Sequence, residues 1–254
     1  MSTTRNVLQA CDGFLGSFVE HFGFYLDSVD RIFELQSRIG LETAALTALP
    51  DEEQARFKSC LLLAESVNTT SMGALLLFAG NFYSDPFALL RMVYEAVALM
   101  HYGNQSSRHG DEVYRTMFKS GLDEAAQSKG EWALIQKAQS NLETGNPDLV
   151  SLRRCLNNFG AHISRAKIVL GNVGTLGNQA ASTVFLSNFS RTEYLMGLGL
   201  LHCLLMMALE EYDKQAASYS GALPSVADEI AAHNKRFAAQ IRPRLQAGQG
   251  PGRN

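Results

Sequence analysis

The sequence predicts an all-α protein, folded as a single bundle of about six to eight helices with one short non-helical insertion. Two observations support this fold class. Apolar residues recur at three- and four-residue steps over most of the chain, which is the spacing of one helix face. Capping residues followed by Pro or by acidic side chains stand before several of these apolar runs. We expect one helical domain over residues 1–245, with its core in the helices at about 50–103, 147–165 and 190–217.

The N-terminal part of the chain predicts two helices. The first covers residues 7–39, where Phe, Leu and Val side chains fall near one face, and Gly40 ends it. The second begins at Pro50, because Pro suits the first turn and the acids that follow it favour the positive end of the helix dipole. We expect this helix to bend near residues 68–71, where polar side chains gather, and to continue to about residue 82.

The central helix is predicted around residues 87–100, whose only charged residues are Arg91 and Glu95. The preceding Ser-Asp-Pro at 84–86 supplies a cap and a Pro at the first helical position. We expect the helix to end near Gly103. A helix that is apolar on nearly all sides is usually buried in the middle of a domain, so this helix is predicted to lie at the centre of the core.

The next part of the chain predicts three further helices and then an interruption. Two short helices are expected at about 110–119 and 131–142, and an amphipathic helix follows from Pro147 to about Arg165. Short β-favouring runs within 166–186 flank three glycines, so we expect a small hairpin or a glycine-rich loop there. Their Gly-x-x-Gly-x-x-Gly spacing is not the dinucleotide-binding pattern.

The C-terminal part predicts two helices and a disordered tail. A capping box at Ser190 opens a helix that carries the apolar run 195–209, which is too short for a membrane span and is interrupted by His202. We interpret this run as a buried helix. A final amphipathic helix is expected at about 226–241, and residues 246–254 have the composition of a disordered tail.

Composition and charge are those of an ordinary cytoplasmic protein. The chain is 46% hydrophobic and 19% charged, and its net charge of −3 gives no general attraction to nucleic acid or to anionic membranes. No acid follows Glu229, whereas five basic residues do; we interpret this end as a solvated tail, with a phosphate-binding arm as the alternative. The four cysteines are scattered without the spacing of a zinc site, and the N-terminus lacks the pattern of a signal peptide.

The first candidate site is the pair of charges in the central helix. Arg91 and Glu95 are four residues apart and therefore lie on one face within contact distance, and Tyr102 falls on the same side. One interpretation is structural, in which the pair links neighbouring helices or fixes their register. The functional interpretation is an interior polar cleft, in which Arg91 faces an anion, Glu95 orients it or acts as a base, and Tyr102 contributes to binding.

The second candidate site lies on the helix that opens at Pro147. Arg154, Asn158 and His162 follow one another at four-residue steps and form a polar flank beside the apolar stripe of that helix. Near neutral pH, His162 can accept or donate a proton. The alternative is that His162 is simply a hydrogen-bonded histidine at the edge of the core.

These motifs resemble bacterial all-helical families similar to the HEPN superfamily. The resemblance covers about residues 50–215 and depends on Leu-Leu-Arg-x-x-x-Glu, from Leu89 to Glu95, and on the Asn-rich segment that ends at His162. It implies RNA cleavage or binding in a bacterial stress or defence setting, with a homodimer and with His162 as the catalytic histidine. Arg154 is the nearest upstream arginine on a compatible face.

The arginine spacing differs from that of HEPN ribonucleases, in which four to six residues separate the Arg from the His. Seven residues separate Arg154 from His162, and Arg153 points to the opposite side of the helix. We therefore consider a composite site, in which Arg91 of the central helix supplies the missing charge and converges with Glu95 and His162. The corresponding activity is a metal-independent, ribonuclease-like reaction with catalytic roles for His162, Arg154, Arg91 and Glu95.

Two functions remain open at this stage. The first is a HEPN-like protein that binds or cleaves RNA or a nucleotide. The second is a non-enzymatic helical interaction or scaffold module, whose buried Arg–Glu pair is structural and which binds a protein partner. We expect no cofactor, no metal site and no membrane association, since the Glu-x-x-His pairs of di-iron bundles do not occur in the sequence.

Overall fold

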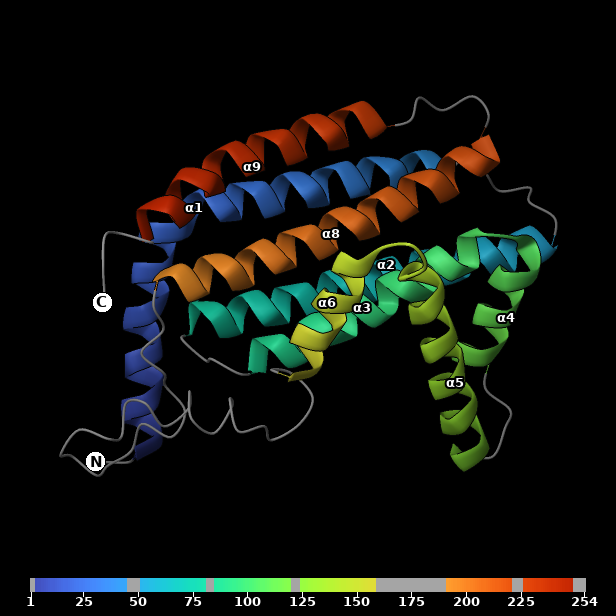
Figure 1. Cartoon of the computed structure of the whole chain (residues 1–254), viewed down its shortest axis with the longest axis horizontal. Coiled ribbons are helices and arrows are strands. Elements are labelled where there is room, and N and C mark those ends of the chain that lie inside the picture. Colours follow the sequence, from blue (N-terminus) through green and yellow to red (C-terminus); the bar gives the residue numbers. More distant parts are fainter. Residues whose placement is uncertain are drawn as a thin grey trace.

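The computed structural model describes residues 3–44, 51–80, 85–119, 124–158, 191–220 and 226–248, and these residues form eight helices and no strand. The all-α prediction is therefore confirmed (Figure 1). In chain order the helices are α1 (Thr3–Ala44), α2 (Asp51–Ala79), α3 (Asp85–Asn104), α4 (Ser107–Met117), α5 (Glu124–Leu142), α6 (Pro147–Leu156), α8 (Arg191–Ser220) and α9 (Ala227–Gly248).

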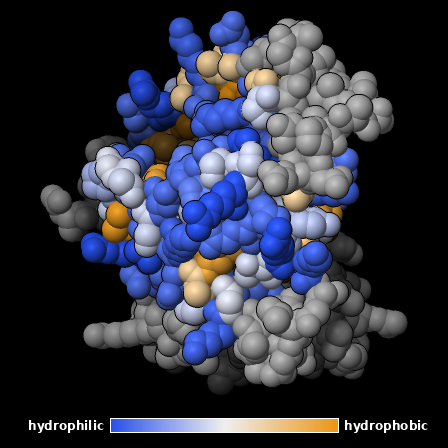
Figure 2. All heavy atoms as spheres, turned by 90° about the vertical axis from the view of Figure 1, so that its right-hand side faces the viewer, coloured by the Kyte–Doolittle hydropathy of each residue, from blue (hydrophilic) through white to orange (hydrophobic). Residues whose placement is uncertain are grey.

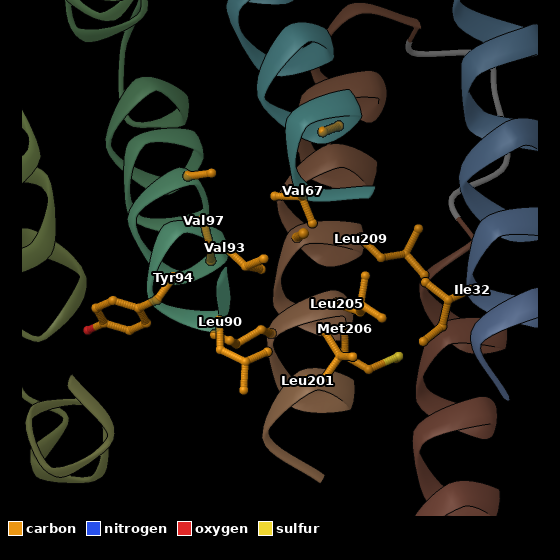
Figure 3. Close-up of a cluster of buried hydrophobic side chains, with 14 of the residues drawn as sticks. Ile32, Val67, Leu90, Val93, Tyr94, Val97, Leu201, Leu205, Met206 and Leu209 are labelled. Atoms are coloured by element: carbon orange, nitrogen blue, oxygen red, sulfur yellow. The ribbon is translucent and has the colours of Figure 1, made fainter. Parts of the chain in front are cut away.

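The long helices form the body of the bundle. Helix α8 packs against α1, α2, α3 and α9, and α3 packs against α2, α4, α5, α6 and α8, so these two helices share the centre. Figure 1 shows α1, α8 and α9 running alongside one another, with α4 and α5 projecting at one end. Figure 3 shows the apolar layer between α3 and α8, where Leu90 and Val93 face the Leu201 and Leu205 side. All four side chains are at most 1% exposed.

Helix α1 is bent rather than straight. Phe22 has non-helical backbone angles (φ −121°, ψ 16°), and the two parts of α1 diverge at this point in Figure 1. Gly23 follows directly, and a glycine is a common cause of a sharp helix kink. Beyond the kink, Tyr25, Val29 and Ile32 recur at the spacing of one face and are at most 3% exposed. The second part of α1 is therefore the part that closes the core.

Several predicted boundaries differ from the observed ones. Helix α2 continues without a break through residues 68–71, where a bend was expected, and Val67 and Ser71 on either side of the polar residues both face the core. Helices α4 and α5 begin earlier than predicted. Helix α9 continues to Gly248, so the first three residues of the predicted disordered tail are helical. The expected hairpin or glycine loop within 166–186 lies outside the described residues.

Two of the described helices are long and apolar enough to cross a membrane by length and composition, over Gln54–Ala79 in α2 and Leu195–Ser218 in α8. The α8 stretch is 67% buried inside the bundle, as expected for a core helix. The α2 stretch is only 39% buried and therefore leaves apolar side chains on the surface. The expectation that the chain does not associate with a membrane stays a prediction.

Candidate functional site

The Arg91–Glu95 pair forms as the spacing predicts. Arg91 Nε donates a hydrogen bond of 2.9 Å to Glu95 Oε1, and the two side chains are 21% and 18% exposed. The pair is therefore neither sealed in the core nor fully solvated. The guanidinium lies 5.9 Å from the ring centre of Trp132 on α5, and that residue is 47% exposed. An arginine, its orienting carboxylate and an accessible aromatic ring thus share one surface between α3 and α5.

Tyr102 takes part in a different group of side chains on α3, α4 and α5. Its hydroxyl donates a 2.7 Å hydrogen bond to Glu112, and Lys137 Nζ lies 2.8 and 3.0 Å from the two oxygens of the same carboxylate. The His109 ring packs on Tyr102 with the ring centres 4.3 Å apart. Tyr102 is only 2% exposed. This group joins three helices at an end of the bundle whose visible surface is mainly hydrophilic in Figure 2.

Helix α6 is attached to α3 through Arg153 rather than through Arg154. Arg153 Nε lies 2.7 Å from Glu143 Oε1, and the Tyr94 hydroxyl donates a 2.7 Å hydrogen bond to the same oxygen. Tyr94 is fully buried and Glu143 is 8% exposed. Burial and the hydrogen bond to Glu143 raise the pKa of Tyr94, so the phenol keeps its proton and acts as a donor. The sequence placed Arg153 away from the site and gave no sign of its partners.

Arg154 of α6 and Asn158, two residues beyond the end of that helix, lie on the surface. Arg154 and Asn158 are exposed, and neither forms an ion pair or hydrogen bond with Arg91 or Glu95 within the described part of the chain. His162 lies outside the described residues. Helix α6 nevertheless packs on α3, and Tyr94, which its Arg153 reaches through Glu143, is only three residues from Arg91. The helix that leads to His162 and the helix that carries Arg91 are therefore neighbours.

A buried group of polar side chains that the sequence did not predict lies between α1, α8 and α9. Ser28 Oγ is 3.0 Å from His233 Nε2 and 3.3 Å from His202 Nδ1. All three residues are at most 6% exposed. Burial, assisted by the neighbouring His233, lowers the pKa of His202 to about 4, so this ring is neutral at pH 7. The interruption of the apolar run by His202 was the only local signal, because its partners are distant in sequence.

A second unpredicted group surrounds Glu211 of α8. Its carboxylate is contacted by His101 Nδ1 at 3.0 Å, by Asn104 Nδ2 at 2.9 Å and by Lys214 Nζ at 2.8 Å. Burial alone raises the pKa of a carboxyl, but these partners outweigh it and lower the pKa of Glu211 to about 2. Glu211 therefore stays charged and fixes the last turn of α3 to α8.

The described part of the chain contains neither a group arranged to bind a metal ion nor an activated thiol. No group of three or more His, Cys, Asp or Glu residues is arranged there to hold a metal ion. Cys60, Cys155 and Cys203 are free thiols, and burial raises the pKa of each of them, so they are weak nucleophiles at neutral pH.

Comparison of the chain with models of known protein families, with curated proteins and with solved structures finds no match. The resemblance to the HEPN superfamily therefore stays a prediction from the sequence motifs.

Proposed function

We propose that the chain is a HEPN-like helical protein that binds RNA or a nucleotide at the surface formed by Arg91, Glu95 and Trp132. The observation that supports this most directly is the part-exposed Arg91–Glu95 pair next to the accessible Trp132 ring. Proteins that bind single-stranded nucleic acid combine cationic groups for the phosphates with aromatic rings on which bases stack. Both groups are available here within one small surface.

Each residue of this surface has a separate role in the proposal. Trp132 stacks on a base, and Arg91 binds a phosphate oxygen through the nitrogens that Glu95 leaves free. Glu95 holds the guanidinium in place, which reduces the entropy lost on binding. Because the chain has a net charge of −3, binding depends on these local contacts rather than on a general attraction.

We propose RNA cleavage in addition to binding, with His162 as the catalytic histidine. A histidine supplies acid–base catalysis at neutral pH, and Arg91 stabilises the charge that develops on the phosphate. The packing of α6 on α3 through Arg153, Glu143 and Tyr94 is the observation that supports this step, because α6 precedes His162 in the sequence and α3 carries Arg91.

Binding can be tested directly because Trp132 is the only tryptophan in the chain. We expect titration with a short single-stranded RNA at low salt to quench its fluorescence. Arg91→Gln should weaken binding about tenfold, because a hydrogen bond to a charged group contributes about 1.5 kcal/mol. Arg115→Gln is the matched control, since Arg115 forms the same i,i+4 pair with Asp111 on α4. Equal binding by the Arg91 and Arg115 variants would contradict the proposal.

Cleavage is tested separately by incubating the wild type and His162→Ala with total RNA. Cleavage that is lost in His162→Ala while fluorescence quenching persists would support a nuclease. If the wild type binds RNA but leaves it intact across a range of pH and metal conditions, the nuclease role is excluded and only the binding role remains.

An interaction module is the second candidate, favoured by the outer face of α2. Leu62, Met72 and Leu76 fall within about 80° of one another around this helix and are 40%, 40% and 61% exposed. Exposed apolar side chains on one helix face are typical of protein contact surfaces. A cellular phenotype that survives His162→Ala but is lost in Leu76→Glu would favour this function over the first.

A further inference from the structure

A pocket of about 280 Å³ lies between α1 and α9, away from the α3 surface. Its lining includes two aromatic residues, Phe24 and Phe237, and two polar residues at its base, Ser28 and His233. The base is part of the buried group that also contains His202. Such a volume is near the lower end of the range for small-molecule sites, so the pocket fits a metabolite-sized ligand.

The base of the pocket is held in one arrangement by hydrogen bonds. The Ser28 hydroxyl has a single proton, so it donates to one of its two histidine neighbours and accepts from the other. Buried polar groups cost stability unless they are paired, and this group is paired within the fold. The pocket therefore has a fixed polar base beneath its aromatic walls.

The aromatic walls are also fixed by their neighbours. The His202 ring stacks on Phe237 with the ring centres 3.5 Å apart, and Tyr25 packs edge-on against the same ring. Phe24 lies 6.4 Å from Phe237, and the guanidinium of Arg244 lies 4.0 Å from the Phe24 ring centre. These contacts fix the aromatic wall of the pocket above its polar base.

The charged residues of the lining differ in how they are paired. Arg31 is held by Glu34 at 2.6 Å and by Glu229 at 2.8 Å. Within the described residues, Asp27 of α1 and Arg236 of α9 form no ion pair, although both line the pocket. Arg236 is close enough to His233 for its charge to help burial lower the pKa of that ring. The pocket thus offers one anion and one cation to a ligand, from opposite helices.

We propose that this pocket binds a small zwitterion of the α-amino-acid type. Arg236 binds its carboxylate, Asp27 binds its ammonium group, and its apolar side chain lies against Phe24 and Phe237. A purely anionic ligand would be repelled by Asp27, and a purely cationic one by Arg236. This site is separate from the proposed RNA surface, and neither proposal depends on the other.

Three related compounds test the proposal by calorimetric titration of the full chain. L-phenylalanine carries both charged groups, phenylacetate lacks the ammonium group, and phenethylamine lacks the carboxylate. We expect L-phenylalanine to bind at least tenfold more tightly than either of the other two. L-leucine and L-tryptophan extend the test to other side-chain shapes. If none of the three amino acids binds at millimolar concentration, or if phenylacetate binds as well as phenylalanine, the proposal is wrong.

Two variants assign the charged groups. Arg236→Gln should weaken phenylalanine and phenylacetate about tenfold and strengthen phenethylamine, because it removes the cation that repels the amine. Asp27→Asn should weaken phenylalanine and phenethylamine and strengthen phenylacetate, because it removes the anion that repels the carboxylate. Asp27 and Arg236 are exposed, so both variants should fold. Arg242→Gln and Asp30→Asn are matched controls, because both residues are exposed on the same helices but do not line the pocket. If Arg242→Gln changed ligand affinity as much as Arg236→Gln, or Asp30→Asn as much as Asp27→Asn, the proposal would be wrong.

Discussion

His202 and Glu211 are two of the ionisable side chains that helix α8 buries; they lie nine residues apart, and one is neutral while the other is charged. His202 is surrounded by Ser28, His233 and the Phe237 ring, so burial lowers its pKa to about 4 and it is neutral at pH 7. Glu211 is also buried, but its three polar partners keep it charged. Burial alone therefore does not decide the charge of a buried group. The charge also depends on how many hydrogen-bond partners favour the charged form.

The two groups also support different parts of the molecule. The His202 group forms the base of the pocket between α1 and α9. The Glu211 group holds His101 and Asn104, which are in the last turns of the helix that carries Arg91. Perturbing each group should therefore affect one candidate site and leave the other intact.

Removal of Glu211 should have the largest effect on stability. In Glu211→Ala, three polar partners lose their carboxylate, and the loss of hydrogen bonds to a charged group costs about 1.5–3 kcal/mol. We expect a loss of this size in the free energy of unfolding, measured by urea denaturation. Glu210→Ala is the control, because the neighbouring Glu210 is exposed and its removal should change stability by about 0.5 kcal/mol or less. Similar losses in both variants would show that the Glu211 partners do not stabilise the fold.

Acidification should reveal the neutral state of His202. The pKa of His202 is lower in the folded chain, at about 4, than its ordinary value of 6.5, so the unfolded chain takes up a proton first as the pH falls. Stability should thus decrease from pH 6.5 down to about 4, by roughly 3 kcal/mol in total for this residue, since each tenfold change in proton affinity is worth about 1.4 kcal/mol. Denaturation at a series of pH values measures this slope.

The same series of measurements separates the two groups. Glu211 loses its contribution only as the pH falls from its ordinary value of 4.5 through about 2, because its pKa is lowered in the folded state. His202→Leu should therefore remove part of the slope between pH 6.5 and 4 and leave the slope below pH 4 unchanged. An unchanged slope above pH 4 in this variant would show that His202 is not buried in its neutral form.

Tyr94→Phe probes Glu143, whose carboxylate contacts two side chains among the described residues, whereas that of Glu211 contacts three. The substitution removes one hydrogen bond from a nearly buried carboxylate and leaves Arg153 in place, so we expect a loss of about 1–2 kcal/mol in the free energy of unfolding. Tyr114→Phe on α4 is the control, since no hydrogen bond to the Tyr114 hydroxyl is present among the described residues. A loss below about 0.5 kcal/mol would indicate that solvent replaces the Tyr94 hydroxyl.

The fold was predictable because helix periodicity and capping are local properties of the sequence. The central helix at 87–100 is an example, since its composition required burial and α3 is mostly buried. The Arg91–Glu95 contact was predictable for the same reason, because four-residue spacing places both side chains on one face of any helix.

Contacts between distant helices were not predictable in this way. His202 was visible as a polar residue in an apolar run, but its partners Ser28 and His233 lie on two other helices. Arg153 was placed on the side of its helix opposite to His162, but nothing in the sequence indicated that it contacts Glu143 next to α3. Helical angles fix the relations within one helix, whereas which face meets a neighbouring helix depends on the packing of the whole bundle.

Arg91→Gln should have the smallest effect on stability of these substitutions. Its pair with Glu95 is within one helix and part-exposed, and such i,i+4 pairs contribute about 0.3–0.5 kcal/mol. We expect a loss of at most about 1 kcal/mol, slightly more than in the Arg115→Gln control, whose arginine is 69% exposed. A loss of 3 kcal/mol or more would mean that Arg91 acts in the same way as Glu211, as a structural charge. In that case the Arg91–Glu95 pair stabilises the bundle. Arg91 would then not be available as the main cation of the RNA surface proposed around Trp132.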